Sequence, residues 1–260
     1  MTTTSLLFQN DSYLKQFEAK VLAVRPDGGI ILDQTCFYYN SGGQPSDKGK
    51  LVRISDGVEA EIKEVRKVDG EVAHYPAGAA PNPMSKNNAA PAASPVIFPS
   101  RFSVDDAVRG EIDWQRRYQL MRMHTAGHVL GAILFNHGAL ITGNQLDVDQ
   151  SRFDFSLEEF NREQLDMFVA QANAELAKDL PVRVYSLPRE EAIKLPGFVK
   201  LANALPPNLP VLRIVEIVGL DVQADGGTHV KSTKEAGQIE LTRVENKGAK
   251  NRRIYFVLKP

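Results

Sequence analysis

Short apolar runs separated by turn residues fill the first part of the chain. Ala19–Val24 is short and rich in apolar residues, Ile30–Tyr39 is β-branched and aromatic, and Pro26–Gly29 between them supplies turn chemistry. Two such runs around a tight turn predict a β-hairpin. The same pattern, divided by Ser55–Gly57 and Asp69–Gly70, predicts strands at Leu51–Ile54, Glu59–Val68 and Glu71–Tyr75. Many short strands joined by Gly/Asp turns favour a small barrel or a sandwich.

The composition changes sharply between Pro76 and Pro99, where Ala, Pro, Asn and Ser dominate. Such a stretch cannot bury enough apolar surface to offset the entropy lost on ordering it. We therefore predict a flexible Ala/Pro-rich insertion at about residues 77–100. The insertion need not end a domain, because Ala107–Ile112 has the composition of one more strand.

The hydrophobic period becomes helical in the second half of the chain. Asp113 is a suitable N-cap for a helix from Trp114 to about Phe135, which Asn136–Gly138 would close. Ser156 and Glu159 form a capping-box pattern, which predicts the start of a second long helix.

Strands and helices follow one another irregularly in the remainder. The pattern predicts a short helix at Arg189–Lys194 and strands at Val182–Leu187, Val211–Val218, Gln238–Val244 and Arg253–Leu258. Because there is no regular βαβ alternation, the fold class is expected to be α+β. We divide the chain into an N-terminal β-barrel domain, residues 1–112, and a second domain, residues 113–260.

Composition narrows the function classes. The net charge of −1 gives no general attraction to nucleic acid, so any such contact needs a local patch. Cys36 is the only cysteine, which excludes an intramolecular disulfide scaffold. The N-terminal segment does not have the pattern of a signal peptide, and no apolar run is long enough to cross a membrane. A cytoplasmic protein without a membrane partner is expected by default.

Two histidines stand one helical turn apart in the first predicted helix. His124 and His128 share a face with apolar residues, so their rings are expected to point inward. Gly127 and Gly131 are poor helix formers, which suggests that something packs close to the backbone there. Taken alone, the pattern is equally consistent with two hydrogen-bonded core histidines.

A second pair of ligand-type residues brackets a glycine-rich loop. Asp225-Gly226-Gly227-Thr228-His229 follows a predicted strand, and its glycines let the backbone fold closely around an ion. An ordinary turn followed by an incidental histidine is the alternative. Together the two motifs supply three imidazoles and one carboxylate, which is a complete set for one divalent ion such as zinc.

The chain resembles the AlaX family of alanyl-tRNA editing proteins and the editing domain of alanyl-tRNA synthetases. The resemblance is carried by His124-Thr-Ala-x-His128, Gly226-Gly-Thr-His229 and a barrel motif around Gly42-Gly43-Gln44. Asp113–Arg117 and Glu245–Phe256 extend it across nearly the whole chain. The length leaves no room for an aminoacylation module, so a free-standing editor is expected.

The resemblance implies an N-terminal barrel followed by a two-layer α/β editing domain that binds a metal ion, most often zinc. It also implies hydrolysis of the ester that joins serine or glycine to alanine tRNA. The expected metal ligands are His124, His128, Asp225 and His229. Residues expected to contact the ester or the developing oxyanion are Thr125, Gly226, Gly227 and Thr228.

Asp225 departs from the family, which usually carries cysteine at this position. A carboxylate oxygen can also ligate zinc, but it makes the site harder and weakens the preference for zinc over iron, manganese or cobalt. We expect Asp225 to ligate; the alternative is a site of three histidines with an open position.

Contacts to the acceptor end of the tRNA are expected from basic side chains. The densest cluster lies in the tail, and a second group comprises Arg116, Arg117 and Arg122. The tail cluster comprises Arg243, Lys247, Lys250, Arg252 and Arg253. Gln44 is a further possible contact. Solvated surface charge is the alternative for the basic groups.

The sequence leaves two other functions open. The chain could be a tRNA- or partner-binding module without deacylase activity, or a metal hydrolase for another small ester or amide. The oligomeric state cannot be predicted from the sequence.

Overall fold

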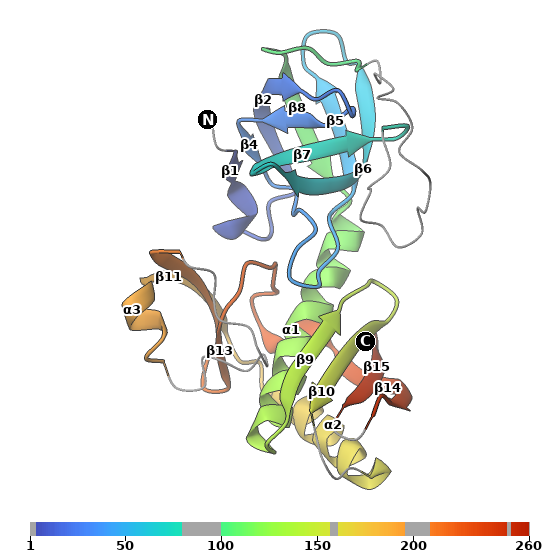
Figure 1. Cartoon of the computed structure of the whole chain (residues 1–260), viewed down its shortest axis with the longest axis vertical. Coiled ribbons are helices and arrows are strands. Elements are labelled where there is room, and N and C mark those ends of the chain that lie inside the picture. Colours follow the sequence, from blue (N-terminus) through green and yellow to red (C-terminus); the bar gives the residue numbers. More distant parts are fainter. Residues whose placement is uncertain (1–3, 80–99, 157–160, 196–208, 249–250, 260) are drawn as a thin grey trace. The chain divides into compact units, whose positions relative to one another are not determined.

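The computed structural model describes residues 4–79, 100–156, 161–195, 209–248 and 251–259 (Figure 1). The chain forms two compact units, one made of Met1–Ser41 with Pro45–Arg117 and the other of Gly42–Gln44 with Tyr118–Pro260. The short segment Gly42–Gln44 thus belongs to the second unit, although it interrupts the sequence of the first.

The first unit is a closed six-stranded barrel, as the strand pattern predicts. Its strand order is β2-β3-β7-β6-β5-β8. The strands are β2 (Gln16–Val24), β3 (Ile30–Leu32), β5 (Gly49–Arg53), β6 (Glu59–Val68), β7 (Glu71–Pro76) and β8 (Ala107–Ile112). β8 pairs with both β2 and β5 and so closes the barrel, which confirms a strand at 107–112. Most of the predicted insertion, residues 80–99, lies outside the described residues.

Smaller elements complete this unit. They are β1 (Ser5–Leu6) with its parallel partner β4 (Gln34–Thr35), and a 3-10 helix, η1 (Leu7–Gln9). The barrel interior is filled by aliphatic and aromatic side chains that alternate along the strands. They include Val21, Ile30, Leu32, Leu51, Ile62, Val65 and Val108.

A buried ion pair fixes the first turn of α1 (Trp114–Asn136) within the barrel unit. Arg117 and Asp47 are both fully buried, and Arg117 Nε lies 3.0 Å from Asp47 Oδ1. The guanidinium also donates to the carbonyls of Ser12 and Cys36, at 2.9 and 2.6 Å. Arg117 therefore has no exposed surface, and the expectation that it contacts a phosphate is wrong. The same burial raises the pKa of the Cys36 thiol to about 12, which leaves it unreactive.

The second unit stacks helices on one face of an antiparallel sheet, which confirms the α+β class (Figure 1). The sheet order is β14 (Gln238–Asn246), β15 (Arg252–Lys259), β10 (Ser151–Ser156) and β9 (Leu140–Gln145). α1 and α2 (Arg162–Leu176) pack on it through one hydrophobic core. A second sheet holds β11 (Val182–Pro188), β12 (Val211–Ile217) and β13 (Asp221–Ala224), and α3 (Arg189–Ala192) packs beside it. The 3-10 helix η2 (Thr233–Ala236) contacts α2.

The expected ends of α1 are confirmed. Asp113 Oδ1 accepts a hydrogen bond from the Arg116 N–H at 3.1 Å, and Gly138 follows the helix with φ of 83°. The expected close approach occurs at Gly127, where a Cβ atom would lie 2.7 Å from the Phe153 ring. At Gly131 the nearest atom would be 3.8 Å away, which is ordinary contact, so that part of the expectation is wrong.

The predicted start of the second long helix is wrong. Ser156 ends strand β10, where its Oγ accepts from the Leu140 N–H at 3.1 Å, and Glu159 lies outside the described residues. α2 begins six residues later with a capping box of the same type, formed by Asn161 and Gln164. Pairing with β9 overrides the local signal, because the Ser156 hydroxyl is engaged with the Leu140 backbone, accepting from its N–H at 3.1 Å and donating to its carbonyl at 3.4 Å.

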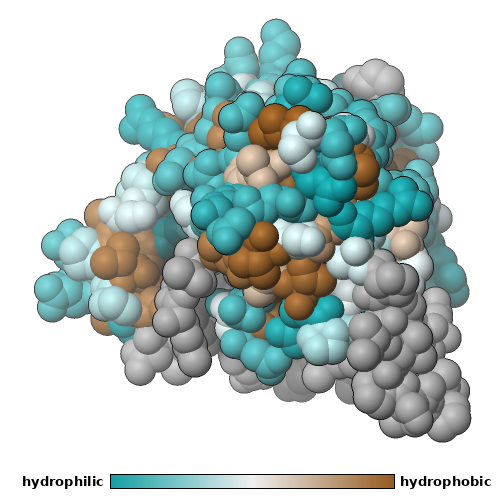
Figure 2. All heavy atoms as spheres, turned by 90° about the horizontal axis from the view of Figure 1, so that it is seen from above, coloured by the Kyte–Doolittle hydropathy of each residue, from teal (hydrophilic) through white to brown (hydrophobic). Residues whose placement is uncertain are grey.

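The surface is mixed in character. Figure 2 shows hydrophilic residues over most of one face, with hydrophobic residues in separate areas between them. No helix in the described ranges is both long enough and apolar enough to cross a membrane.

His74 makes the barrel unit sensitive to acid. It is fully buried, with Nε2 2.8 Å from Thr35 Oγ1 and Nδ1 3.0 Å from the Ile30 carbonyl oxygen. Burial lowers the pKa of His74 from 6.5 to about 4. The unfolded chain therefore binds a proton below about pH 6.5, whereas the folded imidazole stays neutral until about pH 4.

We predict that the free energy of unfolding of this unit falls by roughly 3 kcal/mol as the pH drops from 6.5 to 4 because of His74 alone. Fluorescence of the single tryptophan, Trp114, follows denaturant unfolding of this unit. His74→Gln should remove that part of the pH dependence. His137→Gln, at an exposed histidine, is the matched control and should retain it. Equal pH dependence in the two variants would contradict the prediction.

Candidate metal centre

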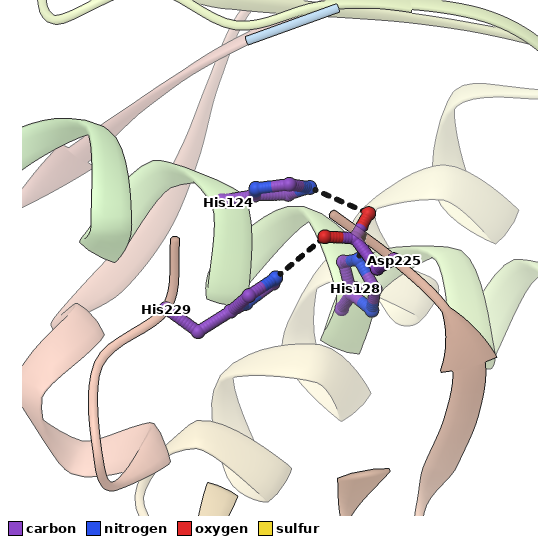
Figure 3. Close-up of side chains that lie close together, drawn as sticks. All are labelled: His124, His128, Asp225 and His229. Carbon is purple, nitrogen blue, oxygen red and sulfur yellow. Dashed lines mark hydrogen bonds and ion pairs between the residues drawn. The ribbon is translucent and has the colours of Figure 1, made fainter. Parts of the chain in front are cut away.

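Two elements and one loop bring four ligand-type side chains together (Figure 3). His124 and His128 project from the same side of α1, one turn apart. Asp225 follows directly after β13, and His229 lies in the loop beyond it. One ligand atom from each of the four lies within 4.8 Å of all the others. The two sequence motifs therefore form one cluster.

The distances within the cluster match those of a metal site. Asp225 Oδ2 lies 3.5 Å from His124 Nε2 and 3.7 Å from His128 Nε2, and Asp225 Oδ1 lies 3.3 Å from His229 Nε2. A tetrahedral ion with bonds of about 2.05 Å has ligand–ligand edges of about 3.3 Å. All three Nε2 atoms are directed at the carboxylate, as the close-up shows for His124 and His229 (Figure 3). The group can therefore hold a metal ion.

In each imidazole, Nδ1 forms a hydrogen bond on the side of the ring that faces away from Asp225. A ring whose Nδ1 is hydrogen-bonded is fixed in orientation and directs its Nε2 lone pair to the opposite side. Nδ1 of His124 lies 2.9 Å from Gln44 Oε1. Nδ1 of His128 lies 2.8 Å from Asp221 Oδ2, and Nδ1 of His229 lies 3.1 Å from Thr125 Oγ1. The cluster is thus arranged to present three Nε2 atoms to a common point.

Gln44 joins the glycine turn to this cluster. Its amide is fully buried: Oε1 accepts from His124 Nδ1 and from the Thr228 N–H at 3.2 Å, while Nε2 donates to Thr228 Oγ1 at 2.9 Å. The turn is fixed in place by β9, because the Leu146 N–H donates to the Gly43 carbonyl at 2.8 Å. Gly43 has φ of 84°, and a Cβ there would lie 2.2 Å from Asn144 Oδ1. The positive φ and the close approach of Asn144 both favour glycine at this position.

The electrostatics favour an ionised carboxylate and two neutral imidazoles, but they favour a proton on the third imidazole, that of His128. Burial would raise the pKa of Asp225, but His124 and hydrogen bonds from the three imidazoles hold that pKa well below its usual range. Burial lowers the pKa of His124 and that of His229, the latter strongly. Burial alone would also lower the pKa of His128, but Asp221 and Asp225 raise it to about 9. A bound cation therefore meets an ionised carboxylate and two neutral imidazoles, and it displaces one proton from His128.

The most accessible ligand is Asp225. Its side chain is 21% exposed, whereas those of the three histidines are 1–8% exposed. Arg213 Nη1 donates to the Asp225 carbonyl oxygen at 2.7 Å and holds the start of the loop. Among the four side chains, that of Asp225 therefore has the most contact with solvent.

Comparison of the sequence with known proteins shows the family to which the chain belongs. An alanyl-tRNA editing protein AlaX-M of Saccharolobus solfataricus is 42% identical over 260 residues, which cover 99% of this chain and 100% of that protein. One of Methanosarcina barkeri is 44% identical over 98% of this chain and 99% of the relative. The chain belongs to the AlaX-M family of alanyl-tRNA editing proteins. The resemblance predicted from the motifs is confirmed.

Matches to synthetases agree with this family. Residues 212–255 match the threonyl and alanyl tRNA synthetase second additional domain, and residues 6–83 match class II (A) tRNA synthetases. The alanine–tRNA ligase of Pyrobaculum neutrophilum is 36% identical over 93% of this chain, which spans 25% of that enzyme. The match to the ligase thus takes in both the barrel and the second unit.

The structure places the four residues expected at the ester in different surroundings. The Thr125 hydroxyl is buried behind His229 and accepts from the Val230 N–H at 3.3 Å. Thr228 is buried against Gln44. The Gly227 N–H donates to Asp225 Oδ1 at 2.5 Å, whereas Gly226 is exposed.

The basic residues expected at the tRNA have contacts within the protein. Arg122 Nε donates to the carbonyls of Glu235 and Ala236, which fixes η2. Lys247 forms an ion pair with Glu245 at 2.6 Å, and Arg252 Nη1 donates to the Gly248 carbonyl at 2.6 Å. Lys250 lies outside the described residues. Contact of these side chains with tRNA stays a prediction.

The sequence did not reveal which residues hold the histidine rings and the loop in position. Gln44 was expected at the substrate, and Asp221 and Arg213 were not singled out. The one usable signal was the alternation Asp221-x-Gln223-x-Asp225, which places three polar side chains on one face of a strand next to the loop.

Gly227 provides a sharp test of the geometry. A Cβ atom there would lie 2.2 Å from His124 Cε1 and 2.9 Å from Asp225 Oδ1. We predict that Gly227→Ala displaces His124 and weakens metal affinity by about tenfold or more. Gly226→Ala is the matched control, since a Cβ there meets nothing within 4 Å. Metal titration of both variants makes the comparison, and equal affinities would contradict the geometry.

Proposed function

We propose that the protein is a trans-editing hydrolase that removes serine or glycine from mischarged alanine tRNA. The observation that carries this proposal is the convergence of three Nε2 atoms on Asp225, each ring being held from behind, in a chain that covers its AlaX-M relatives from end to end. The bond broken is the ester between the amino acid and the terminal ribose. Water supplies the hydroxyl group, and the products are the free amino acid and the uncharged tRNA.

The reaction compensates for the limited selectivity with which a synthetic site can bind alanine. A synthetic site built for alanine cannot strongly reject glycine, which is smaller, or serine, which adds only a hydroxyl. A second site that hydrolyses the wrong product restores the selectivity. Such a protein works in the cytoplasm, where aminoacyl-tRNA supplies translation.

We propose that His124, His128, Asp225 and His229 hold one divalent ion, with zinc as the first candidate. Imidazole nitrogens and a carboxylate oxygen suit zinc, although the carboxylate also suits manganese, iron or cobalt. Such an ion supplies Lewis-acid polarisation of the ester carbonyl or of a water molecule. All four side chains would hold the ion, and Asp225, the most exposed of them, would be the donor nearest to the arriving ester.

The loop glycines have separate tasks in this proposal. The Gly227 N–H donates to Asp225 Oδ1 and orients the carboxylate. The Gly226 N–H has no hydrogen-bond partner in the part of the chain that the structure describes, and the residue is exposed beside Asp225. Gly226 is therefore the better candidate for donating to the developing oxyanion. Thr125 and Thr228 contribute by holding His229 and Gln44, respectively.

The acceptor end of the tRNA brings the ester to the Asp225 side. Phosphate contacts near the site are needed because the net charge of the chain is only −1. Arg252, Lys247 and Lys250 are the candidates from the β14–β15 region. These contacts are expected to weaken with rising salt concentration.

Deacylation assays test the function. We predict hydrolysis of seryl- or glycyl-tRNA(Ala), with alanyl-tRNA(Ala) largely spared, and loss of activity after chelation that added zinc restores. His229→Ala is the inactive control, and spontaneous ester hydrolysis is measured in parallel. Full activity after complete metal removal would contradict the metal mechanism. No hydrolysis of any of these tRNAs would favour a binding module or a hydrolase for another ester.

Metal content tests Asp225 separately. We predict that Asp225→Ala lowers zinc affinity, because one of four donors is lost, and that Asp225→Cys retains or tightens it, because thiolate is a softer ligand. Glu216→Gln removes a carboxylate elsewhere on the β12–β13 hairpin and should change nothing. Unchanged metal occupancy in Asp225→Ala would show that the three histidines act without it.

A further inference from the structure

A second carboxylate, that of Asp221, lies behind the ring of His128. Asp221 Oδ2 is 2.8 Å from His128 Nδ1, and the residue is 2% exposed. On the opposite side of the ring, His128 Nε2 lies 3.7 Å from Asp225 Oδ2. One imidazole therefore stands between two carboxylates that are four residues apart in the sequence.

The β12–β13 hairpin sets this arrangement. Asp221 pairs with Ile217, and Gln223 pairs with Val215, so the two polar side chains share a face with two buried aliphatic residues. The Asp225 N–H continues the ladder by donating to the Arg213 carbonyl at 3.1 Å. Alternation along the strand therefore places Asp221, Gln223 and Asp225 on one face. A single register fixes both carboxylates relative to His128.

Asp221 is also held in place itself. Gln223 Nε2 donates to its two carboxylate oxygens at 2.9 and 3.2 Å. A buried carboxylate is maintained only where such partners compensate for the loss of water. The acceptor behind His128 is thus an oriented carboxylate, whereas His124 and His229 are backed by an amide and a hydroxyl. The three rings are alike in geometry but differ in the charge behind them.

We propose that Asp221 is a positioning residue of the metal centre. It accepts a hydrogen bond from the His128 Nδ1–H and thereby fixes the tautomer whose Nε2 lone pair faces the ion. Its negative charge strengthens the charge donation of that imidazole. Asp221 contacts neither the ion nor the substrate, and acts through His128 alone. This inference rests on the proposed metal centre and adds to it a determinant of metal affinity.

Metal affinities of full-length variants test the proposal. Asp221→Asn keeps the shape and an acceptor oxygen but removes the charge, and Asp221→Ala removes the hydrogen bond as well. We expect zinc and cobalt affinities, measured by competition with a chromophoric chelator, to fall by about 10- to 100-fold in Asp221→Ala and by a smaller factor in Asp221→Asn. Glu216→Gln is the charge-matched control on the same hairpin and should bind as the wild type does.

A second measurement needs no variant at Asp221. In the zinc-loaded wild type, ¹⁵N resonances of the histidines should show His128 protonated at Nδ1 and bound through Nε2, with His128→Gln giving the assignment. Binding through Nδ1 would overturn the proposal, as would wild-type metal affinity in folded Asp221→Ala. A wild type that binds no metal would instead overturn the metal centre itself, and this inference with it. The two failures are therefore distinguishable, whatever the deacylase assay shows.

Discussion

The centre depends on the hydrogen bonds that engage Nδ1 of His124, His128 and His229. An imidazole has two nitrogens on opposite sides, so what binds one nitrogen decides where the other points. Gln44, Asp221 and Thr125 occupy the outer side of the three rings, and Asp225 is left on the inner side. Without these partners the rings could rotate or exchange tautomers, and four ligand-type residues in one cluster would not amount to a metal site.

The same hydrogen bonds explain why Gly43 and Gly227 are glycines and why the segment Gly42–Gln44 belongs to the second unit. Because Gln44 must reach His124, the segment Gly42–Gln44 belongs to the second unit although barrel sequence surrounds it. At Gly43, which has φ of 84°, a Cβ atom would clash with the Asn144 side chain, and at Gly227 a Cβ atom would clash with the His124 ring. Backbone packs closely against side chains at both positions, so glycine is used here for close approach as well as for turning.

The sequence was sufficient where local signals and tertiary structure agree. Strands at 59–68 and 107–112 have the predicted bounds, and α1 has its predicted cap, because alternation and capping are local patterns. β9 and β10 were missed, since segments such as Leu-Ile-Thr-Gly-Asn-Gln gain their strand form from pairing. The four-residue spacing of the ligands identified the cluster, but the groups behind the rings lie 80, 93 and 104 residues away along the chain. No local pattern reports such contacts.

Asp225 differs from the three histidines in how it is held. Each histidine is locked from behind and almost fully buried, whereas the carboxylate is 21% exposed and is oriented by its own loop through the Gly227 N–H. A carboxylate has two oxygens, and Oδ1 and Oδ2 already serve different histidines in this arrangement. If the group holds an ion in the proposed reaction, the ester or water would need room beside it. The donor that can shift with the least disturbance is the exposed one on a glycine loop, so the rigid part of the centre is the three histidines and the adaptable part is Asp225.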